Sequence, residues 1–226
     1  SGAGLNLSRI RSSKELLSSG GTASGPVSFM RGADASAGTI KSGGATRRAA
    51  KMVVLDVDHP DIEEFVETKA REEDKIRALR DAGFDMDLGG KDITSVQYQN
   101  ANNSVRVTDE FMTAVEGGTG FGLRARTTGE VIERVDAREL FHKIAKAAWE
   151  CADVQYHDTI NSWHTTPESG PITASNPCSE YMSLDNSSCN LASLNLLKFL
   201  REDGTFDAET FVKAVELIIT AMDISI

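Results

Sequence analysis

The amino-acid sequence predicts an α/β fold whose strands are largely parallel. Short β-branched runs alternate along the chain with longer segments whose apolar residues recur at helical spacing, and this alternation is typical of a parallel sheet covered by helices. The 226 residues are 40% hydrophobic and 26% charged, the composition of an ordinary globular protein with a sizeable core. That length corresponds to one large domain or a tight pair of domains.

The first half of the chain alternates expected strands and helices. Small and apolar residues precede the basic turn Arg9-Ile10-Arg11, Gly and Ser mark a loop, and Pro26 suits the first turn of a helix. A β-branched run then predicts a buried strand, and the charged stretch after it predicts a solvated helix. In order, these elements are a strand within residues 1–11, a loop at 18–24, a helix at 26–37, a strand at 52–57 and a helix that opens at Asp58 or His59 and reaches Asp81.

The second half continues the same alternation. Thr108, Asp136 and Asp207 each stand before an apolar-periodic run, where their side-chain oxygens would accept backbone N–H groups at a helix start. The expected elements are a strand at 105–107, a helix at 109–115, a strand at 121–126, a helix after Asp136 and a helix after Asp207. The glycine-rich run 117–122 leads into a strand, so it does not predict a dinucleotide-binding loop.

Charge and composition exclude several classes of protein. The formal charge of -10 argues against nucleic acid as a partner, and the apolar runs are far too short for a membrane span. Three cysteines without a CxxC pair argue against a disulfide scaffold and against a metal site, and they favour a reducing cytoplasm. The chain starts without Met and stops inside an apolar helical repeat, so we expect a piece of a longer protein.

The segment that carries chemistry runs from residue 172 to 196, with Asn176-Pro177-Cys178-Ser179-Glu180 at its centre. Pro177 fixes its own φ and disfavours the helical region for Asn176, so we predict an extended segment. In an extended chain Asn176, Cys178 and Glu180 share one face. An amide, a thiol and a carboxylate would then lie within about 13 Å, where one small substrate could touch all three.

Two other interpretations of this segment stay open on the residues alone. Cys178 is equally compatible with a buried cysteine in a turn, flanked by ordinary turn and surface residues. Alternatively, Cys178 is a nucleophile with His164 or His157 as its base, although no local signature of a cysteine hydrolase accompanies it.

Residues 176–180, followed by Ser-Cys-Asn-Leu-Ala-Ser-Leu-Asn-Leu at 188–196, resemble the catalytic segment of the ribonucleotide reductase large subunit, most closely the vitamin B12-dependent (class II) enzymes. The stretches 1–11, 41–52, 54–62 and 149–165 also resemble that family, so the likeness covers essentially the whole chain. It departs from the family where Ala152-Asp153 runs straight into Val154 without Pro-Gly, and where Thr166 replaces a cysteine. The resemblance implies that residues 1–226 form part of a ten-stranded α/β barrel with a central finger loop.

The resemblance also implies roles for the central residues. Cys178 would hold a transient thiyl radical that takes the 3′-hydrogen of the ribose. Glu180 would be the base on the 3′-hydroxyl, and Asn176 would orient the ribose hydroxyls. Cys189 would be one half of a redox-active disulfide whose partner lies upstream of Ser1. Cys151 matches neither cysteine role and is expected to be structural.

Other positions would contact the substrate or an effector. Pro177 and Ser179 belong to the implied substrate site, and Gly2 would let the backbone approach the substrate, although tight strand packing explains a glycine there equally well. Arg11, Lys41 and Arg47 would contact a deoxynucleoside triphosphate effector through their charges. Without the family, residues 41–48 are simply a basic turn.

The implied activity is reduction of ribonucleoside di- or triphosphates to 2′-deoxyribonucleotides for DNA synthesis, with adenosylcobalamin as the cofactor. A thioredoxin-like reductant is implied with it, a monomer and a homodimer both stay open, and neither nucleic acid nor membrane is expected as a partner. The alternatives are the large subunit of an iron-dependent class I enzyme and a non-catalytic nucleotide-binding domain. We expect this piece of the protein to be inactive by itself.

Overall fold

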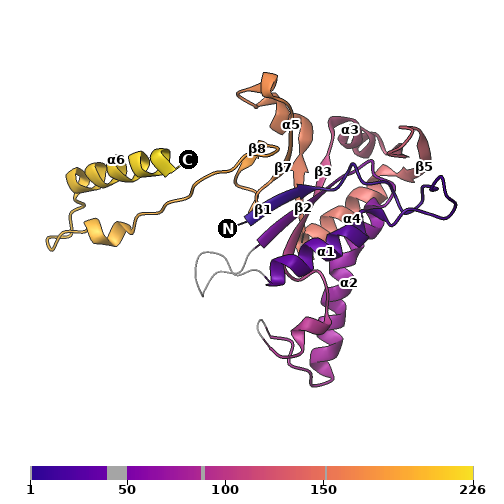
Figure 1. Cartoon of the computed structure of the whole chain (residues 1–226), viewed down its shortest axis with the longest axis horizontal. Helices are drawn as coiled ribbons and strands as arrows, with labels where there is room; N and C mark the ends of the chain where they lie inside the picture. Colours follow the sequence, from indigo (N-terminus) through magenta and orange to yellow (C-terminus); the bar gives the residue numbers. More distant parts are fainter. Residues whose placement is uncertain (1, 40–49, 88–89, 151, 226) are drawn as a thin grey trace. The chain divides into compact units, whose positions relative to one another are not determined.

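The computed structural model describes residues 2–39, 50–87, 90–150 and 152–225 (Figure 1). The chain divides into two compact units, Ser1–Asp185 and Asn186–Ile226. Lys41, Arg47 and Cys151 lie outside the described residues.

Within the described part of the first unit, a parallel four-stranded sheet confirms the α/β prediction. The strands lie in the order β1-β2-β3-β6 and every neighbouring pair is parallel. They are β1 (Gly2–Asn6), β2 (Ala50–Asp56), β3 (Ala101–Val107) and β6 (Ala152–Tyr156). β6 forms although the Pro-Gly of the family is missing after Asp153, and the four described strands form an open sheet rather than a closed barrel.

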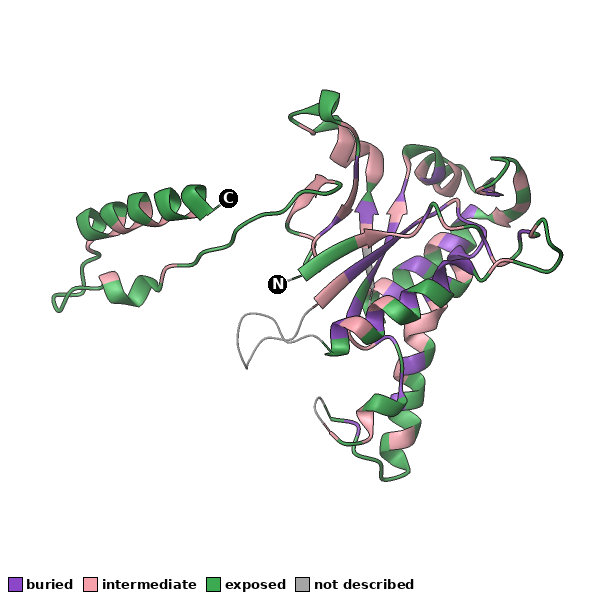
Figure 2. Ribbon diagram, in the orientation of Figure 1, coloured by how far each residue is buried: buried purple, intermediate pink, exposed green. Residues whose placement is uncertain are grey.

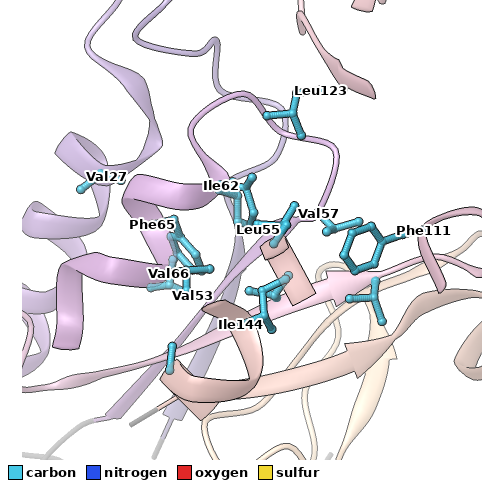
Figure 3. Close-up of a cluster of buried hydrophobic side chains, with 14 of the residues drawn as sticks. Val27, Val53, Leu55, Val57, Ile62, Phe65, Val66, Phe111, Leu123 and Ile144 are labelled. Atoms are coloured by element: carbon cyan, nitrogen blue, oxygen red, sulfur yellow. The ribbon is translucent and has the colours of Figure 1, made fainter. Parts of the chain in front are cut away.

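Helices cover one face of this sheet. Val53 and Leu55 of β2 belong to the same buried cluster as Phe65 and Ile144, which come from two different helices (Figure 3). Burial is concentrated along the sheet and on the helix faces turned toward it (Figure 2). The helices that contribute to this cluster are α1 (Gly25–Thr39), α2 (Ile62–Asp81), α3 (Asp109–Gly117) and α4 (Ala137–Glu150). The short helix α5 (His157–Ser162) contributes no residue to it and bonds instead to Ile172 through Asn161.

A β-hairpin lies on the opposite face. Its strands are β7 (Ile172–Ser175) and β8 (Met182–Leu184), which pair antiparallel. Met52 and Val54 alternate along β2 with the residues of the helix-side cluster, and both are fully buried outside that cluster. Since alternate residues of a strand point to opposite faces, helices and hairpin enclose the sheet between them.

Most expected elements form close to where the sequence places them. Thr108 Oγ1 accepts from Phe111 N at 3.2 Å and so caps α3 as predicted. The glycine-rich run ends that helix, with Gly118 in the left-handed region at φ 62°, and continues into β4 (Gly120–Arg124). The sequence missed β5 (Val131–Asp136), the antiparallel partner of β4, and also β6 and α5. Short 3₁₀ helices stand at Ile93–Ser95 and Pro167–Ser169.

The predicted start of the second helix at Asp58 or His59 is wrong, because α2 begins at Ile62. His59 is fully buried in the preceding turn, where its Nε2 donates to Ile10 O at 2.9 Å and its Nδ1 accepts from Asp61 N at 3.0 Å. Burial, followed by the nearby Arg126 charge, lowers the pKa of His59 against the opposing hydrogen bond to Ile10 O. The side-chain bonds hold this segment as a turn.

The second unit contains a 3₁₀ helix, Leu196–Phe199, and α6 (Ala208–Ser225). Asp207 Oδ1 accepts from Thr210 N at 3.1 Å, which confirms the predicted cap. The apolar stripe of α6 lines a groove of about 480 Å³ together with Ala192, Ser193, Leu194 and Leu196. Among the described residues of the whole chain, no helix is long and apolar enough to cross a membrane.

Candidate active site

The central segment is a tight turn, so the predicted extended conformation is wrong. Residues 176–181 connect β7 to β8, and Asn176 N donates to Tyr181 O at 3.2 Å. Ser179 N donates to Asn176 O at 3.1 Å, and Ser179 has a φ of 62°. The fixed φ of Pro177 suits the second position of a β-turn as well as an extended strand. Shared strand geometry therefore does not bring Asn176, Cys178 and Glu180 together.

The side-chain oxygen of Asn176 closes this turn. Its Oδ1 accepts from Tyr181 N at 3.0 Å. Its Nδ2 has no hydrogen-bond partner among the described residues. The Asn176 Nδ2 is therefore available to donate a hydrogen bond to a hydroxyl group of a bound ligand.

The thiol and the carboxylate of the turn face solvent. Cys178 and Glu180 are exposed, Asn176 and Ser179 are half-buried, and Pro177 is buried. The buried proline anchors the turn while its reactive groups remain accessible to a ligand. Cys189 is also exposed, in the second unit.

Three strands of the sheet hold the turn from below. A Cβ atom built on Gly2 of β1 would lie 2.4 Å from Pro177 Cγ, so the proline ring packs directly on this glycine. Asn102 Nδ2 of β3 donates to Pro177 O at 2.6 Å. Gln155 Nε2 of β6 donates to Ser175 Oγ at 2.9 Å. Sequence reasoning missed Asn102 and Gln155, although the alternation of side chains along a strand could have placed both on one face.

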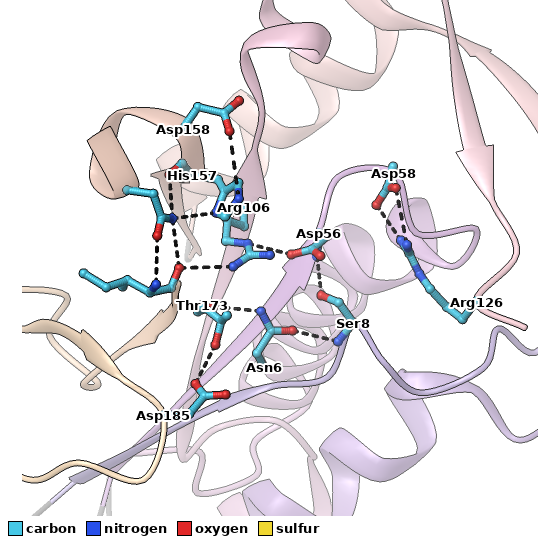
Figure 4. Close-up of polar contacts among 12 residues, drawn as sticks. Asn6, Ser8, Asp56, Asp58, Arg106, Arg126, His157, Asp158, Thr173 and Asp185 are labelled. Carbon is cyan, nitrogen blue, oxygen red and sulfur yellow. Dashed lines mark hydrogen bonds and ion pairs between the residues drawn. The ribbon is translucent and has the colours of Figure 1, made fainter. Parts of the chain in front are cut away.

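A polar network at the carboxyl ends of the strands fixes the start of β7 (Figure 4). Arg106 pairs with Asp56 at 2.7 Å and its Nη1 lies 3.4 Å from Ile172 O. Asn161 bonds to both backbone groups of Ile172. Its Oδ1 accepts from Ile172 N at 2.8 Å, and its Nδ2 donates to Ile172 O at 3.1 Å. The hairpin is therefore anchored at its base as well as at its turn.

Asn6 adds a second anchor from β1 (Figure 4). Its Nδ2 donates to Thr173 O at 2.7 Å, and its Oδ1 accepts from Ser8 N at 2.8 Å. Thr173 Oγ1 in turn donates to Asp185 Oδ1 at 2.6 Å, which links β7 to the residue after β8.

Neither histidine of the cysteine-hydrolase interpretation is bonded to Cys178 within the described residues. His164 uses both ring nitrogens in its own loop, donating to Gly170 O at 3.1 Å and accepting from Thr166 N at 3.3 Å. His157 Nδ1 lies 3.0 Å from Asn161 Nδ2. Burial, and after it the Arg106 charge, lowers the pKa of His157. This geometry argues against the cysteine-hydrolase interpretation, and the exposure of Cys178 shows that the buried-cysteine interpretation is also wrong.

The loop after β1 carries Arg11 and a tightly bound carboxylate. Arg11 is exposed and has no hydrogen-bond or ion-pair partner in the described part of the chain. Glu15 is buried and accepts backbone N–H groups of Ser12, Arg126 and Thr127 at 2.8, 3.1 and 2.9 Å. Burial opposes its ionisation, but these bonds prevail and lower the pKa of Glu15 to about 2. The loop is thus fixed on the segment after β4.

A separate hollow of about 390 Å³ lies between α3 and the β4–β5 hairpin. Its lining includes Glu110, Arg124 and Arg134, and none of the predicted site residues. It therefore adds nothing to the site around Cys178.

Comparison with known proteins gives matches over the whole chain. The family model described as ribonucleotide reductase, barrel domain, matches residues 1–226. The vitamin B12-dependent ribonucleotide reductase of Streptomyces clavuligerus is 80% identical over 232 residues, covering 100% of this chain and 24% of that protein. The protein of that name from Rhodopirellula baltica is 54% identical over 228 residues, covering 99% of this chain and 22% of that protein.

A more distant relative, the vitamin B12-dependent ribonucleoside-diphosphate reductase of Mycobacterium tuberculosis (strain CDC 1551 / Oshkosh), is 38% identical over 225 residues, covering 98% of this chain and 29% of that protein. The chain thus spans about a quarter of the length of the curated relatives it matches. Since the family model matches it from end to end, the chain belongs to the ribonucleotide reductase barrel-domain family.

Proposed function

We propose that the chain is the reactive part of an adenosylcobalamin-dependent ribonucleotide reductase, which converts ribonucleoside di- or triphosphates to 2′-deoxyribonucleotides. The observation that carries the proposal is the anchored turn: an exposed thiol and carboxylate stand on a short loop that three strands hold against one face of a parallel sheet. The names of the relatives supply the reaction class and the cofactor.

In this proposal Cys178 takes the 3′-hydrogen of the ribose as a thiyl radical and later returns it. A thiol suits that step because its S–H bond is comparatively weak. Glu180, two residues further along the turn, takes the proton of the 3′-hydroxyl. Asn176 donates from its unpartnered Nδ2 to a ribose hydroxyl. The exposed positions of Cys178 and Glu180 leave room for the sugar above the turn.

The reduction removes the 2′-hydroxyl as water and consumes two electrons. We assign one half of the dithiol that supplies them to Cys189, which is exposed and unpaired. Oxidation of that dithiol gives a disulfide, and a thioredoxin-like protein would reduce it again. Arg11, exposed and without a described partner, is the proposed contact to a deoxynucleoside triphosphate effector, together with Lys41 and Arg47.

The residues present fit the cofactor at one point: the Cys178 thiol is exposed and can be reached by a large group bound above the turn. No group of three or more metal-binding side chains occurs among the described residues, and the corrin ring itself carries the cobalt. When bound, adenosylcobalamin supplies the unpaired electron that starts the radical chemistry. The chain contributes the thiol and the strands that hold it in place.

Several features of the parent protein follow from this proposal. The four-stranded sheet would be part of a ten-stranded barrel, with the β7–β8 hairpin as its finger loop, because the hairpin covers the sheet face opposite the helices. A closed barrel would shield the thiyl radical from water and oxygen. We place the enzyme in the reducing cytoplasm.

The test uses the full-length parent protein with Cys178→Ser. Turnover should fall below detection while effector binding remains, since Arg11 lies in a different loop. Cys151→Ser is the matched control, because the proposal gives Cys151 no role, and it should keep near wild-type turnover. Turnover that survives Cys178→Ser refutes the proposal.

Two further results separate the alternatives. Turnover without added adenosylcobalamin would favour an iron-dependent class I enzyme. Effector binding by a wild-type protein that never reduces a ribonucleotide would favour a nucleotide-binding domain without catalysis.

A further inference from the structure

The reactive turn touches the sheet through very few side chains. Gly2 and Gly4 let the hairpin backbone rest directly on β1, because a Cβ atom at Gly4 would lie 1.9 Å from Ser175 O. Glycines provide room but no directional bond. The position of the turn along the sheet therefore depends on polar contacts from the neighbouring strands β3 and β6.

Asn102 makes the polar contact nearest to the thiol. Its Nδ2 donates to Pro177 O at 2.6 Å, across 75 residues of sequence. That carbonyl belongs to the peptide unit that joins Pro177 to Cys178, and a peptide unit is planar. Fixing the carbonyl oxygen therefore restrains the plane that carries the nitrogen and Cα of Cys178. Among the described residues no other group donates to Pro177 O.

Gln155 contacts Ser175, which is further from Cys178 along the chain than Pro177 is. It is 2% exposed and donates to Ser175 Oγ, which lies 2.9 Å from Asn176 O. This chain of contacts holds the beginning of the turn, whereas Asn102 holds the peptide unit of Cys178 itself. Asn102 is exposed, so replacing it removes a bond without opening a cavity in the core.

We infer that Asn102 is a positioning residue, whose bond to Pro177 O sets the direction in which the Cys178 thiol points toward the sugar. This role rests on the proposed function, because it matters for turnover only if Cys178 carries the chemistry. Displacement of a reacting group by about 1 Å can lower a rate by about 10²-fold. Loss of the bond should thus lower kcat while leaving substrate binding nearly unchanged.

The variants for the test are Asn102→Ala and Asn102→Asp in the full-length protein. Aspartate keeps the shape of asparagine, but an ionised carboxylate cannot donate to a carbonyl oxygen. Asn6→Ala is the matched control, because Asn6 also donates from its Nδ2 to a hairpin carbonyl, at 2.7 Å, but at Thr173. Thermal unfolding of all three variants shows whether the fold survives.

Two readouts are measured on each variant. The first is amide hydrogen exchange at residues 179–181, where Ser179 N–H and Tyr181 N–H are bonded within the turn. We expect exchange to accelerate at least several-fold in both Asn102 variants and to stay near wild type in Asn6→Ala. The second is steady-state turnover, where kcat should fall about 10²-fold in both Asn102 variants with KM changed little. Asn6→Ala should lose clearly less kcat than either Asn102 variant, because its bond restrains Thr173 at the start of β7 and not the peptide unit of Cys178.

The outcomes separate this inference from the proposed function. Unchanged exchange at 179–181 in both Asn102 variants overturns the inference, as does wild-type kcat despite faster exchange. A wild-type protein without turnover refutes the proposed function, while the exchange measurement still decides whether Asn102 holds the turn. Equal kcat losses in Asn102→Ala and Asn6→Ala would also overturn the inference, because they would indicate a general loosening of the hairpin.

Discussion

Replacing Gly4 by alanine should displace β7 and with it the reactive turn. The added Cβ would lie 1.9 Å from Ser175 O, whereas ordinary contact begins at 3.4 Å, so the two strands must separate by about 1.5 Å. Gly4 does not have a positive φ, so the effect is steric and involves no backbone strain. Ser175 O is backbone and cannot swing aside as a flexible side chain would.

Two measurements quantify the effect in the full-length protein. Overpacking of this kind costs about 1–3 kcal/mol of unfolding free energy, which denaturant unfolding measures. A displaced hairpin should also lower kcat by about 10²-fold or more. Gly32→Ala is the control, because a Cβ atom there meets nothing within 4 Å and lies on a helix, where alanine gains about 0.5–1 kcal/mol. Wild-type stability and turnover in Gly4→Ala would refute the packing of β7 on β1.

Two further predictions concern the polar contacts that hold the hairpin and the loop after β1. Glu15→Gln should destabilise the fold by about 1–3 kcal/mol at pH 7, because the pKa of Glu15 is lowered from 4.5 to about 2 on folding and an uncharged amide oxygen accepts the backbone N–H groups less strongly than a carboxylate does. A lowered carboxylate pKa stabilises the fold above about pH 4.5, and the benefit is lost as the pH falls toward 2, so urea unfolding should show the gap between wild type and variant closing in acid. A gap that stays constant with pH would contradict this account of Glu15. Arg106→Ala should cost about 2–4 kcal/mol, because it leaves the mostly buried Asp56 unpaired and removes a contact to Ile172. Arg71→Ala, which breaks an exposed pair with Glu67, should change the unfolding free energy very little, and equal losses would refute the distinction.

Apolar periodicity predicts three of the four strands of the parallel sheet, β1, β2 and β3, but not β6, and it does not show that the expected strand at 121–126 pairs antiparallel. Val53, Leu55, Phe65 and Ile144 are buried together because strand and helix periods each place apolar residues on one face. β5 was missed because its sequence, Val-Ile-Glu-Arg-Val-Asp, mixes charges with half-buried positions, and only its pairing with β4 makes it a strand.

The local errors have side-chain causes. The start of α2 was misplaced because His59 bonds to Ile10 O, a long-range contact that no local pattern reveals. The segment at Pro177 was predicted as extended because a fixed proline φ permits both a strand and a turn. The turn forms because Asn176 closes it with its own Oδ1.

The sequence of residues 172–196 does not indicate which side chains of the sheet hold the turn. Asn102 lies 75 residues before Pro177, and Gln155 lies 20 residues before Ser175. Both contacts depend on the order of the strands, which places β3 and β6 side by side. The family resemblance named the reactive residues but not the strands beneath them.

The central claim is that the Cys178 sulfur exchanges a hydrogen atom with the ribose. The most direct measurement is turnover of a ribonucleotide deuterated at the 3′ position, in the full-length protein with adenosylcobalamin. A slower rate with the deuterated substrate, and loss of all 3′ cleavage in Cys178→Ser, is the predicted result. Cleavage of the 3′ bond that persists in Cys178→Ser would contradict the account.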